Sequence, residues 1–340
     1  MRLLKIMSSA MRCTAAIVMC TVLGVAAVSA QTKEDKSRQF YIDTLKGKKI
    51  VWIAAVMGND LQNEWERVFR QMSESVGIDF SLRDANFNTS AQSQALEAAI
   101  GEKPDLLIVQ SLNVNLLARQ IKRAQEEGIP VIQLNLKSLQ DSAGFVGVDY
   151  VTMGEQIAQE MVDQCTKEKG RSNKVAFVQG DISAADSYLQ MQGVNAVLSK
   201  HPEIQVVSNQ SGMWDPNKAH DVTATVLQQH PDLCAIMGIW GVMDMGMAQA
   251  IKEAGLTGKV LHYSNDGGSQ YMCDAVKSGA VTKFWSYQAP GQARDVMQLA
   301  FYILQNPDKW QDLRGMLYSP MVVITPENAS SGICFQPAKK

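Results

Sequence analysis

Short apolar runs alternate with amphipathic stretches along most of the chain. The runs are too short for buried helices and are typical of strands that are buried on both faces of a parallel sheet. A first series of predicted strands occupies residues 50–56, 78–82, 106–110, 130–134 and 145–148, and a second series occupies 174–179, 204–208, 234–239, 259–264 and 281–286.

Between the strands, apolar residues recur with the spacing of one helix face. Trp65, Phe69 and Val76 fall on one such stripe, and the Gly77 that follows suits a left-handed helix end. Gly128 is expected to end another helix in the same way. Helices are predicted over residues 61–77, 114–127, 154–165, 217–229, 243–254 and 268–277.

The strands and helices follow one another about every 25–30 residues, which is the rhythm of β-α-β units. The rhythm restarts near residue 150, so the pattern predicts two similar halves rather than one long sheet. The predicted fold class is α/β, with two doubly wound parallel-sheet lobes. Because ligands of such sheets bind beyond the carboxyl ends of the strands, the residues that follow each strand are the candidate site.

The beginning of the chain has a different pattern. A positively charged stretch comes first, with Arg2, Lys5 and Arg12. It leads into the uncharged apolar residues 13–28, and Val28-Ser29-Ala30 has the form of a cleavage site. We therefore predict a signal peptide over residues 1–30 and a periplasmic product. A membrane anchor is the alternative, but the apolar run is shorter than the roughly 20 residues of a spanning helix.

Composition limits the class of protein further. The 340 residues are 46% hydrophobic and suffice for about two domains of roughly 150 residues. A formal net charge of −2 argues against nucleic acid as the partner. Beyond the leader the cysteines are Cys165, Cys234, Cys273 and Cys334. Four cysteines allow three pairings in an oxidising compartment, and both disulfides and buried thiols stay open.

The sequence offers little support for an enzyme. The histidines are His201, His220, His230 and His262, and no two of them have the spacing of a metal site. Nucleophile-elbow, phosphate-loop and dinucleotide-binding glycine motifs are missing from the sequence. We expect a binding protein without catalytic residues, metal or cofactor; a secreted α/β enzyme is a weaker hypothesis.

Neutral amides and aromatic rings gather after the predicted strands. Amides donate and accept hydrogen bonds, as hydroxyl groups require, a carboxylate can accept from two adjacent hydroxyls, and an indole can cover the apolar face of a sugar ring. The candidate binding residues of these types are Asn59, Asn135, Trp214, Trp240, Asp266 and Gln288.

Each of these residues also has a purely structural interpretation. Asn59 is a good N-cap for the helix that follows it. Asp266 and Gly267 together form a common turn pair. Either Trp could belong to the core instead of a binding site.

Ordered motifs along the chain carry a resemblance to a known family. The segments are K-P-D-L-L-I-V-Q at 103–110, E-G-I-P-V-I-Q-L-N at 127–135, V-A-F-V-Q-G at 175–180 and the S-N-D-G turn at 264–267. In order and spacing the chain resembles the type I periplasmic solute-binding proteins of ABC transporters, most closely the ribose-binding-like sugar branch. The resemblance covers about residues 48–325.

The resemblance implies two lobes joined by a three-segment hinge. The crossings are expected near Asp149, near Gln288 and near Tyr318-Pro320. After the leader and a flexible lead-in over 31–47, the implied N-terminal lobe is 48–149 plus 289–319, and the C-terminal lobe is 150–288 plus 320–340. The ligand is expected between the lobes, which close around it.

When the ligand-binding positions of the family are transferred to this sequence, they add two candidate binding residues. They also show where this sequence differs from the family pattern. Gln190 stands where the family has an Arg, with Tyr188 nearby, and Asn135-Leu136 replaces an Asp-Arg pair. Trp240 takes the place of an Asn, whereas Asp266 is retained. With the charged cluster reduced and an indole added, a larger or more apolar sugar-like polyol is expected rather than ribose.

The function that follows is capture of a small sugar or polyol in the periplasm and delivery to an ABC permease, by a monomer. Two alternatives stay open. The carboxylate of Asp266 could hold an organic cation among the rings of Trp214, Trp240, Tyr188 and Tyr287. The same fold could also serve as a sensory solute receptor.

Overall fold

The computed structural model describes residues 36–337, so the predicted signal peptide lies outside the described residues. The chain divides at Gly47 into two compact units. In the first unit, residues 36–45 form a helix, although we expected a flexible lead-in over 31–47. This stretch contains no Gly or Pro, and the Gln39 side chain donates a hydrogen bond to Asp43 one turn later (2.7 Å).

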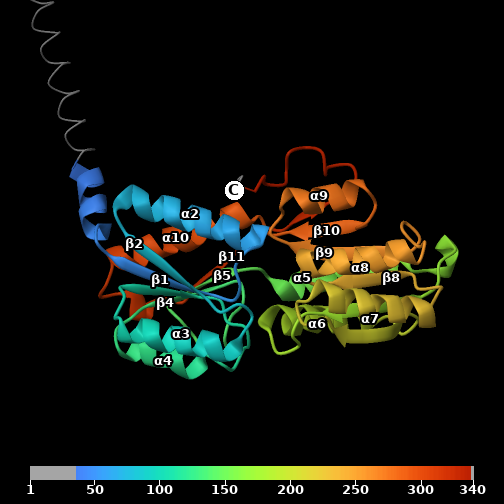
Figure 1. The fold of residues 1–340 in the computed structure, drawn as a ribbon, viewed down its shortest axis with the longest axis horizontal. Coiled ribbons are helices and arrows are strands. Elements are labelled where there is room, and N and C mark those ends of the chain that lie inside the picture. Colours follow the sequence, from blue (N-terminus) through green and yellow to red (C-terminus); the bar gives the residue numbers. More distant parts are fainter. Residues whose placement is uncertain (1–35, 338–340) are drawn as a thin grey trace, which may run out of the picture. The chain divides into compact units, whose positions relative to one another are not determined.

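From Lys48 onward, the described strands form two six-stranded sheets (Figure 1). The first sheet has the order β11-β5-β4-β3-β1-β2, and all its neighbouring strands are parallel. Its strands are β1 (Lys49–Ala54), β2 (Asp79–Asp84), β3 (Leu106–Val109), β4 (Val131–Leu134), β5 (Gly144–Gly147) and β11 (Gly315–Tyr318). This sheet and its helices are called the first lobe below.

The second sheet repeats the arrangement, with the order β12-β10-β9-β8-β6-β7. Its strands are parallel except for β12, which runs antiparallel to β10. They are β6 (Lys174–Gln179), β7 (Gln205–Ser211), β8 (Ala235–Gly238), β9 (Leu261–Asp266), β10 (Lys283–Ser286) and β12 (Val322–Ile324). This sheet and its helices are the second lobe, and the two-lobed α/β prediction is confirmed.

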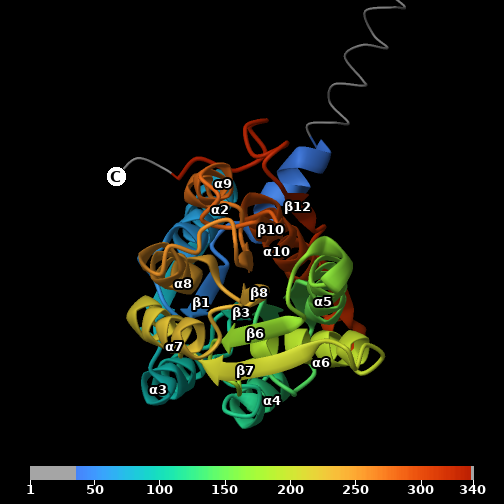
Figure 2. The same ribbon diagram turned by 90° about the vertical axis from the view of Figure 1, so that its right-hand side faces the viewer.

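Helices cover both faces of each sheet. In the first lobe α2 (Asp60–Val76) packs with α10 (Ala289–Gln305) on one face, and α3 (Thr89–Gly101) and α4 (Ala118–Glu126) lie on the other (Figure 1). In the second lobe the pairs are α5 (Tyr150–Gln164) with α6 (Ala185–Leu198), and α7 (Pro216–Gln229) with α8 (Gly241–Glu253) (Figure 2). The lobe is completed by α9 (Gln270–Lys277) and the 3₁₀ turn Lys167–Lys169, and the first lobe has a 3₁₀ turn at Trp310–Asp312. No helix among residues 36–337 is long and apolar enough to cross a membrane.

The glycines that were expected to end helices, and the apolar runs that were expected to form buried strands, take the predicted conformations. Gly77 ends α2 with φ 72°, and Gly128 follows α4 with φ 84°, both in the left-handed region. The central strands β3 and β8 are buried along their whole length, because helices cover both faces of the sheet.

The chain passes between the lobes three times. The first passage joins β5 to α5, the second joins β10 to α10, and the third joins β11 to β12. The three passages are hydrogen-bonded to one another. The Ser319 N–H donates to the carbonyl of Gly147 (2.7 Å), and the Gln292 amide donates to the Ser319 hydroxyl (3.2 Å).

Small residues let α5 and α6 approach closely. A Cβ at Gly154 would lie 2.1 Å from the carbonyl oxygen of Gln190, and one at Gly193 would lie 2.0 Å from the carbonyl oxygen of Val151. Any side chain at these positions would collide with backbone. The close packing brings the beginnings of both helices together, which places Tyr150 and Asp186 on one wall of the cavity described next.

Candidate functional site

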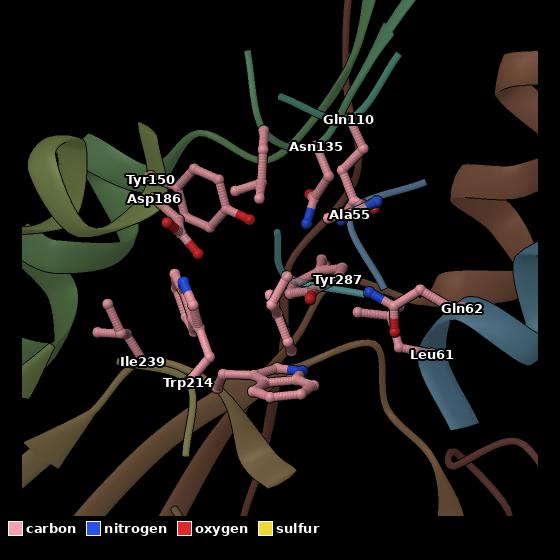
Figure 3. A pocket seen from close by; sticks show the side chains of 13 residues that line it. Ala55, Leu61, Gln62, Gln110, Asn135, Tyr150, Asp186, Trp214, Ile239 and Tyr287 are labelled. Carbon is pink, nitrogen blue, oxygen red and sulfur yellow. The ribbon is translucent and has the colours of Figure 1, made fainter. Parts of the chain in front are cut away.

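A cavity lies where the carboxyl ends of the two sheets meet (Figure 3). Its empty volume, part of which is open to solvent, is about 390 Å³. In both sheets the strand order reverses beside the first strand, between β1 and β3 and between β6 and β8. Ala55 and Gln110 follow the first pair, and Ile239 and Trp240 follow β8, so the cavity occupies the switch points of both lobes.

The first lobe supplies the amides of the wall, which are Gln62, Gln110 and Asn135. The Gln110 side chain accepts from the N–H of Ala55 (3.2 Å), which fixes it between the ends of β1 and β3. Behind it, buried Gln92 donates to the carbonyl of Gln110 (2.7 Å). These contacts hold the Gln110 amide in place before any ligand arrives.

Asn135 is held in a strained backbone conformation. Its φ is 59°, and its side-chain oxygen accepts from Gln292 of α10 (3.2 Å). Burial raises the pKa of Tyr150 and that of Tyr287 well above the usual value. The Asn135 amide faces both hydroxyls, and these contacts lower each pKa by a smaller amount. Asn135 therefore connects the end of β4 with the first and second passages between the lobes.

The second lobe supplies most of the aromatic surface. The rings of Trp214 and Trp240 meet edge to face with centroids 6.1 Å apart. Phe87, in the loop after β2 of the first lobe, lies parallel to Trp214 and edge-on to Trp240. Three aromatic rings from two lobes thus surround one end of the cavity.

Trp214 depends on a glycine beneath it. A Cβ at Gly180 would fall 2.1 Å from the indole ring, so only glycine leaves room for this side chain. Trp214 and its neighbour Met213 both have left-handed backbones, with φ 63° and 53°. Strain of this kind costs on the order of 1–3 kcal/mol for each residue and is concentrated at functional sites.

Asp186 is the acidic side chain of the wall. It lies in the first turn of α6 and is 6% exposed, and Figure 3 shows its carboxyl beside Tyr150 and Trp214. Its hydrogen-bond donors are backbone N–H groups, that of Ser187 (2.8 Å) and its own. Burial raises the pKa of Asp186 to about 7, and the nearby Asp181 charge also raises it. Among the described residues that line the cavity, none is Lys, Arg or His.

Three of the eight predicted site residues lie on the cavity wall: Asn135, Trp214 and Trp240. Asn59 instead caps α2, because its side-chain oxygen accepts from the N–H of Gln62 (3.3 Å). Tyr188 is 59% exposed and does not line the cavity.

The other three predicted residues lie behind the wall or at its edge. Gln190 is fully buried and accepts from the Asn265 side chain (2.9 Å). Asp266 accepts from the Tyr271 hydroxyl (2.7 Å) and the N–H of Gly267 (2.6 Å), and burial raises its pKa to about 6. Gln288 has φ 56° at the second passage, and its amide donates to Ser286 (3.1 Å).

Sequence reasoning did not select several wall residues, which are Gln62, Phe87, Gln110, Tyr150 and Asp186, and it named Tyr287 only for the alternative of an organic cation. The strand-end rule could have found Gln110 and Tyr287, which follow β3 and β10 directly. Phe87 follows β2 at the same distance as Trp214 follows β7, so the strand-end rule could have found it as well. Asp186 had no such signal, because it lies in the first turn of a helix that the packing of the lobe directs toward the cavity.

Comparison with known proteins agrees with this geometry. A family model described as a periplasmic binding protein domain matches residues 50–308. The chain belongs to this family. It is a family of binding proteins of transporters rather than of enzymes, which confirms the expectation from the sequence.

Two relatives of this periplasmic binding protein have names that state their ligands. The D-allose-binding periplasmic protein of Escherichia coli (strain K12) is 30% identical over 216 residues, 61% of this chain and 68% of that protein. The xylitol-binding protein of Mycolicibacterium smegmatis is 28% identical over 204 residues, 59% of this chain and 57% of that protein. Among solved structures, the Caulobacter myo-inositol binding protein bound to myo-inositol has a TM-score of 0.74. At 20% identity over 84% of this chain and 95% of that chain, it shows a shared fold.

Proposed function

We propose that this periplasmic binding protein is the substrate-binding component of an ABC transporter, and that it captures a sugar or sugar-like polyol between its lobes. The observation that carries the proposal is the composition of the cavity at the two switch points. One lobe contributes fixed amides and the other contributes indoles. A ring with hydroxyl groups at its edge and C–H groups on its face satisfies both walls. The relatives named for D-allose and xylitol support this ligand class.

The proposal divides the chain into an N-terminal lobe of 48–149 plus 289–319 and a C-terminal lobe of 150–288 plus 320–340. Closure is supported by polar contacts between the lobes away from the cavity. Asn113 of the first lobe donates to the Ser183 hydroxyl of the second (2.8 Å), and the Val114 N–H donates to the Ser183 carbonyl (3.1 Å). Ligand binding would favour this closed arrangement, whose outer surface the permease then recognises.

The proposed location is the periplasm, after removal of residues 1–30, and the proposed state is a monomer. The location is supported by a relative that is named as periplasmic and by two disulfides, Cys165–Cys234 and Cys273–Cys334. Disulfides persist in oxidising compartments such as the periplasm.

Ligand screening tests the proposal. Thermal-shift assays followed by calorimetry against sugars and polyols should identify at least one ligand that raises the melting temperature. Trp214→Ala should weaken that ligand roughly tenfold or more, because the indole covers its apolar face. Tyr188→Ala is the matched control, since this exposed ring lies off the cavity wall. Failure of every sugar and polyol to bind, or full affinity in Trp214→Ala, would contradict the proposal.

A further inference from the structure

We propose that the polyol captured by this protein carries a protonated amine, and that Asp186 receives it. The chemical class is an amino sugar or an amino-substituted cyclic polyol. This inference rests on the proposed function, because it assigns a substrate class to the same cavity.

Charge balance is the first argument. The carboxyl of Asp186 is 6% exposed, lies on the wall of the cavity and has backbone N–H groups as its hydrogen-bond donors. No basic side chain lines this cavity within residues 36–337. The groups that face Asp186 are the hydroxyls of Tyr150 and Tyr287 and the carboxylate of Asp181, and none of these can carry a positive charge.

A buried carboxylate without a cation is costly, and the protein has two ways to avoid the cost. Either Asp186 takes up a proton or the ligand supplies a positive charge. A neutral hydroxyl can donate a hydrogen bond but leaves the charge in place. An ammonium group donates hydrogen bonds and cancels the charge, so it fits the ionised carboxyl best.

The surrounding rings are the second argument. Phe87, Trp214 and Trp240 contact one another around the cavity, and Tyr150 and Tyr287 complete its aromatic lining. Aromatic faces attract cations that have been removed from water, and indole does so most strongly. A carboxylate beside such rings combines two recognition elements for the same group.

The amides limit the ligand to a polyol with one amine rather than a simple organic cation. Gln110 and Asn135 lie in the first lobe and are held by buried partners. They provide donors and acceptors for hydroxyl groups on the part of the ligand that does not contact Asp186. An alkylammonium ion has no hydroxyl groups and would make no use of the remaining hydrogen-bonding capacity of these amides.

Matched ligand pairs test the inference in the full-length mature protein. Calorimetry would compare D-glucosamine with D-glucose, D-galactosamine with D-galactose, and an aminodeoxy-inositol with myo-inositol, all at pH 7.5. We expect the amine of at least one pair to bind ten times more tightly than its hydroxyl partner. Asp186→Asn should abolish that preference, whereas Asp308→Asn, the same change at an exposed site, should retain it.

The pH dependence of the unaltered protein provides a second readout that needs no variant. Burial raises the pKa of Asp186 to about 7, and protonation removes the charge that the amine requires, so affinity for the amine should fall on the order of tenfold between pH 7.5 and pH 5.5. A neutral ligand bound through a protonated Asp186 would show the opposite trend.

The outcomes separate the two proposals. If hydroxyl partners bind as well as the amines, or affinity does not fall toward pH 5.5, the amine inference is overturned and the sugar-binding function stands. If no member of any pair binds, the amine inference is overturned, and the sugar-binding function is overturned only if the wider screen of sugars and polyols also finds no ligand.

Discussion

The ring of Phe87 lies parallel to that of Trp214, with centroids 6.4 Å apart and planes 7° from parallel. Phe87 follows the edge strand β2 of the first sheet, and Trp214 follows the edge strand β7 of the second. The two residues are far apart in sequence and belong to different lobes. The pair therefore forms only when the lobes are closed, and it links the aromatic wall to closure.

Removal of the Phe87 ring should weaken ligand binding with little effect on folding. Because the side chain is 36% exposed, Phe87→Ala should lower the melting temperature only slightly. Loss of an aromatic contact of about 0.5–1.5 kcal/mol, together with its buried area, should weaken binding about 5- to 30-fold by calorimetry. Tyr302→Ala, on the exposed face of α10, is the control. Unchanged affinity would mean that Phe87 does not support the closed state.

A methyl group at position 180 should displace the neighbouring indole. In Gly180→Ala the new Cβ would overlap the ring of Trp214, so the loop must move, at a cost of about 1–3 kcal/mol. Ligand affinity should fall with stability, as measured by calorimetry and urea unfolding. Gly291→Ala in α10 is the matched control, because its nearest neighbour would be 3.8 Å away, and it should be neutral or slightly stabilising. Equal stability of the two variants would refute this account of Trp214.

The disulfide Cys165–Cys234 should stabilise the second lobe. It joins the end of α5 to the residue before β8 and closes a long loop, with a sequence separation of 69. Replacement of both cysteines by serine should lower the free energy of unfolding by about 2–5 kcal/mol in urea titrations. Added reductant should lower the urea midpoint of the parent protein by more than that of this variant, because the variant has only Cys273–Cys334 to lose. A parent protein whose urea midpoint is the same with and without reductant would argue against the bond.

Stability without ligand should decrease from pH 5 to pH 8. Burial raises the pKa of Asp186 to about 7 and that of Asp266 to about 6, so both carboxyls stabilise the fold while protonated and lose this contribution as pH rises through those values. Burial lowers the pKa of His262 to about 4, so its neutral form adds stability as pH rises from 4 to about 6.5 and opposes the trend only there.

Asp186→Asn should flatten this decrease. The raised pKa corresponds to a contribution on the order of 2–4 kcal/mol, which should reappear as a higher melting temperature of the variant at pH 8 than of the parent. Only near pH 4 and below, where the carboxyl of the unfolded chain also binds its proton, should the two proteins differ little. A constant difference from pH 4 to pH 8 would contradict a buried, proton-binding Asp186.

Much of the fold follows from local pattern. Each of the ten predicted strands has a counterpart in β1 to β10. The central strands were predictable because a parallel strand buried on both faces must be apolar, whereas β2 and β7 are edge strands without a buried residue and carry only short apolar runs. The strands β11 and β12 were not predicted. β11 is a mostly exposed edge strand and β12 is only three residues long, so neither requires a continuous apolar run.

The candidate site was predictable mainly where the residues that follow a strand lie on the cavity wall. Asn135 after β4 and Trp240 after β8 are of this kind, and both line the cavity. Gln190 and Asp266 had equally suitable chemistry, but neighbouring side chains already occupy them. The type of a residue and its distance from a strand do not show whether its side chain is oriented toward the cavity or toward a neighbouring side chain.

Local information in the chain thus determined the alternation of strands and helices, the two lobes and the general place of the site. Hydrophobic periodicity and turn chemistry act over a few neighbouring residues, so both can be recognised in the sequence alone. Tertiary structure alone decided that Phe87 meets Trp214, that Cys165 pairs with Cys234, and that Asp186 faces a cavity without a basic side chain among its described lining. These relationships join residues far apart in sequence, and they exist only after the packing of helices on two sheets has oriented each side chain.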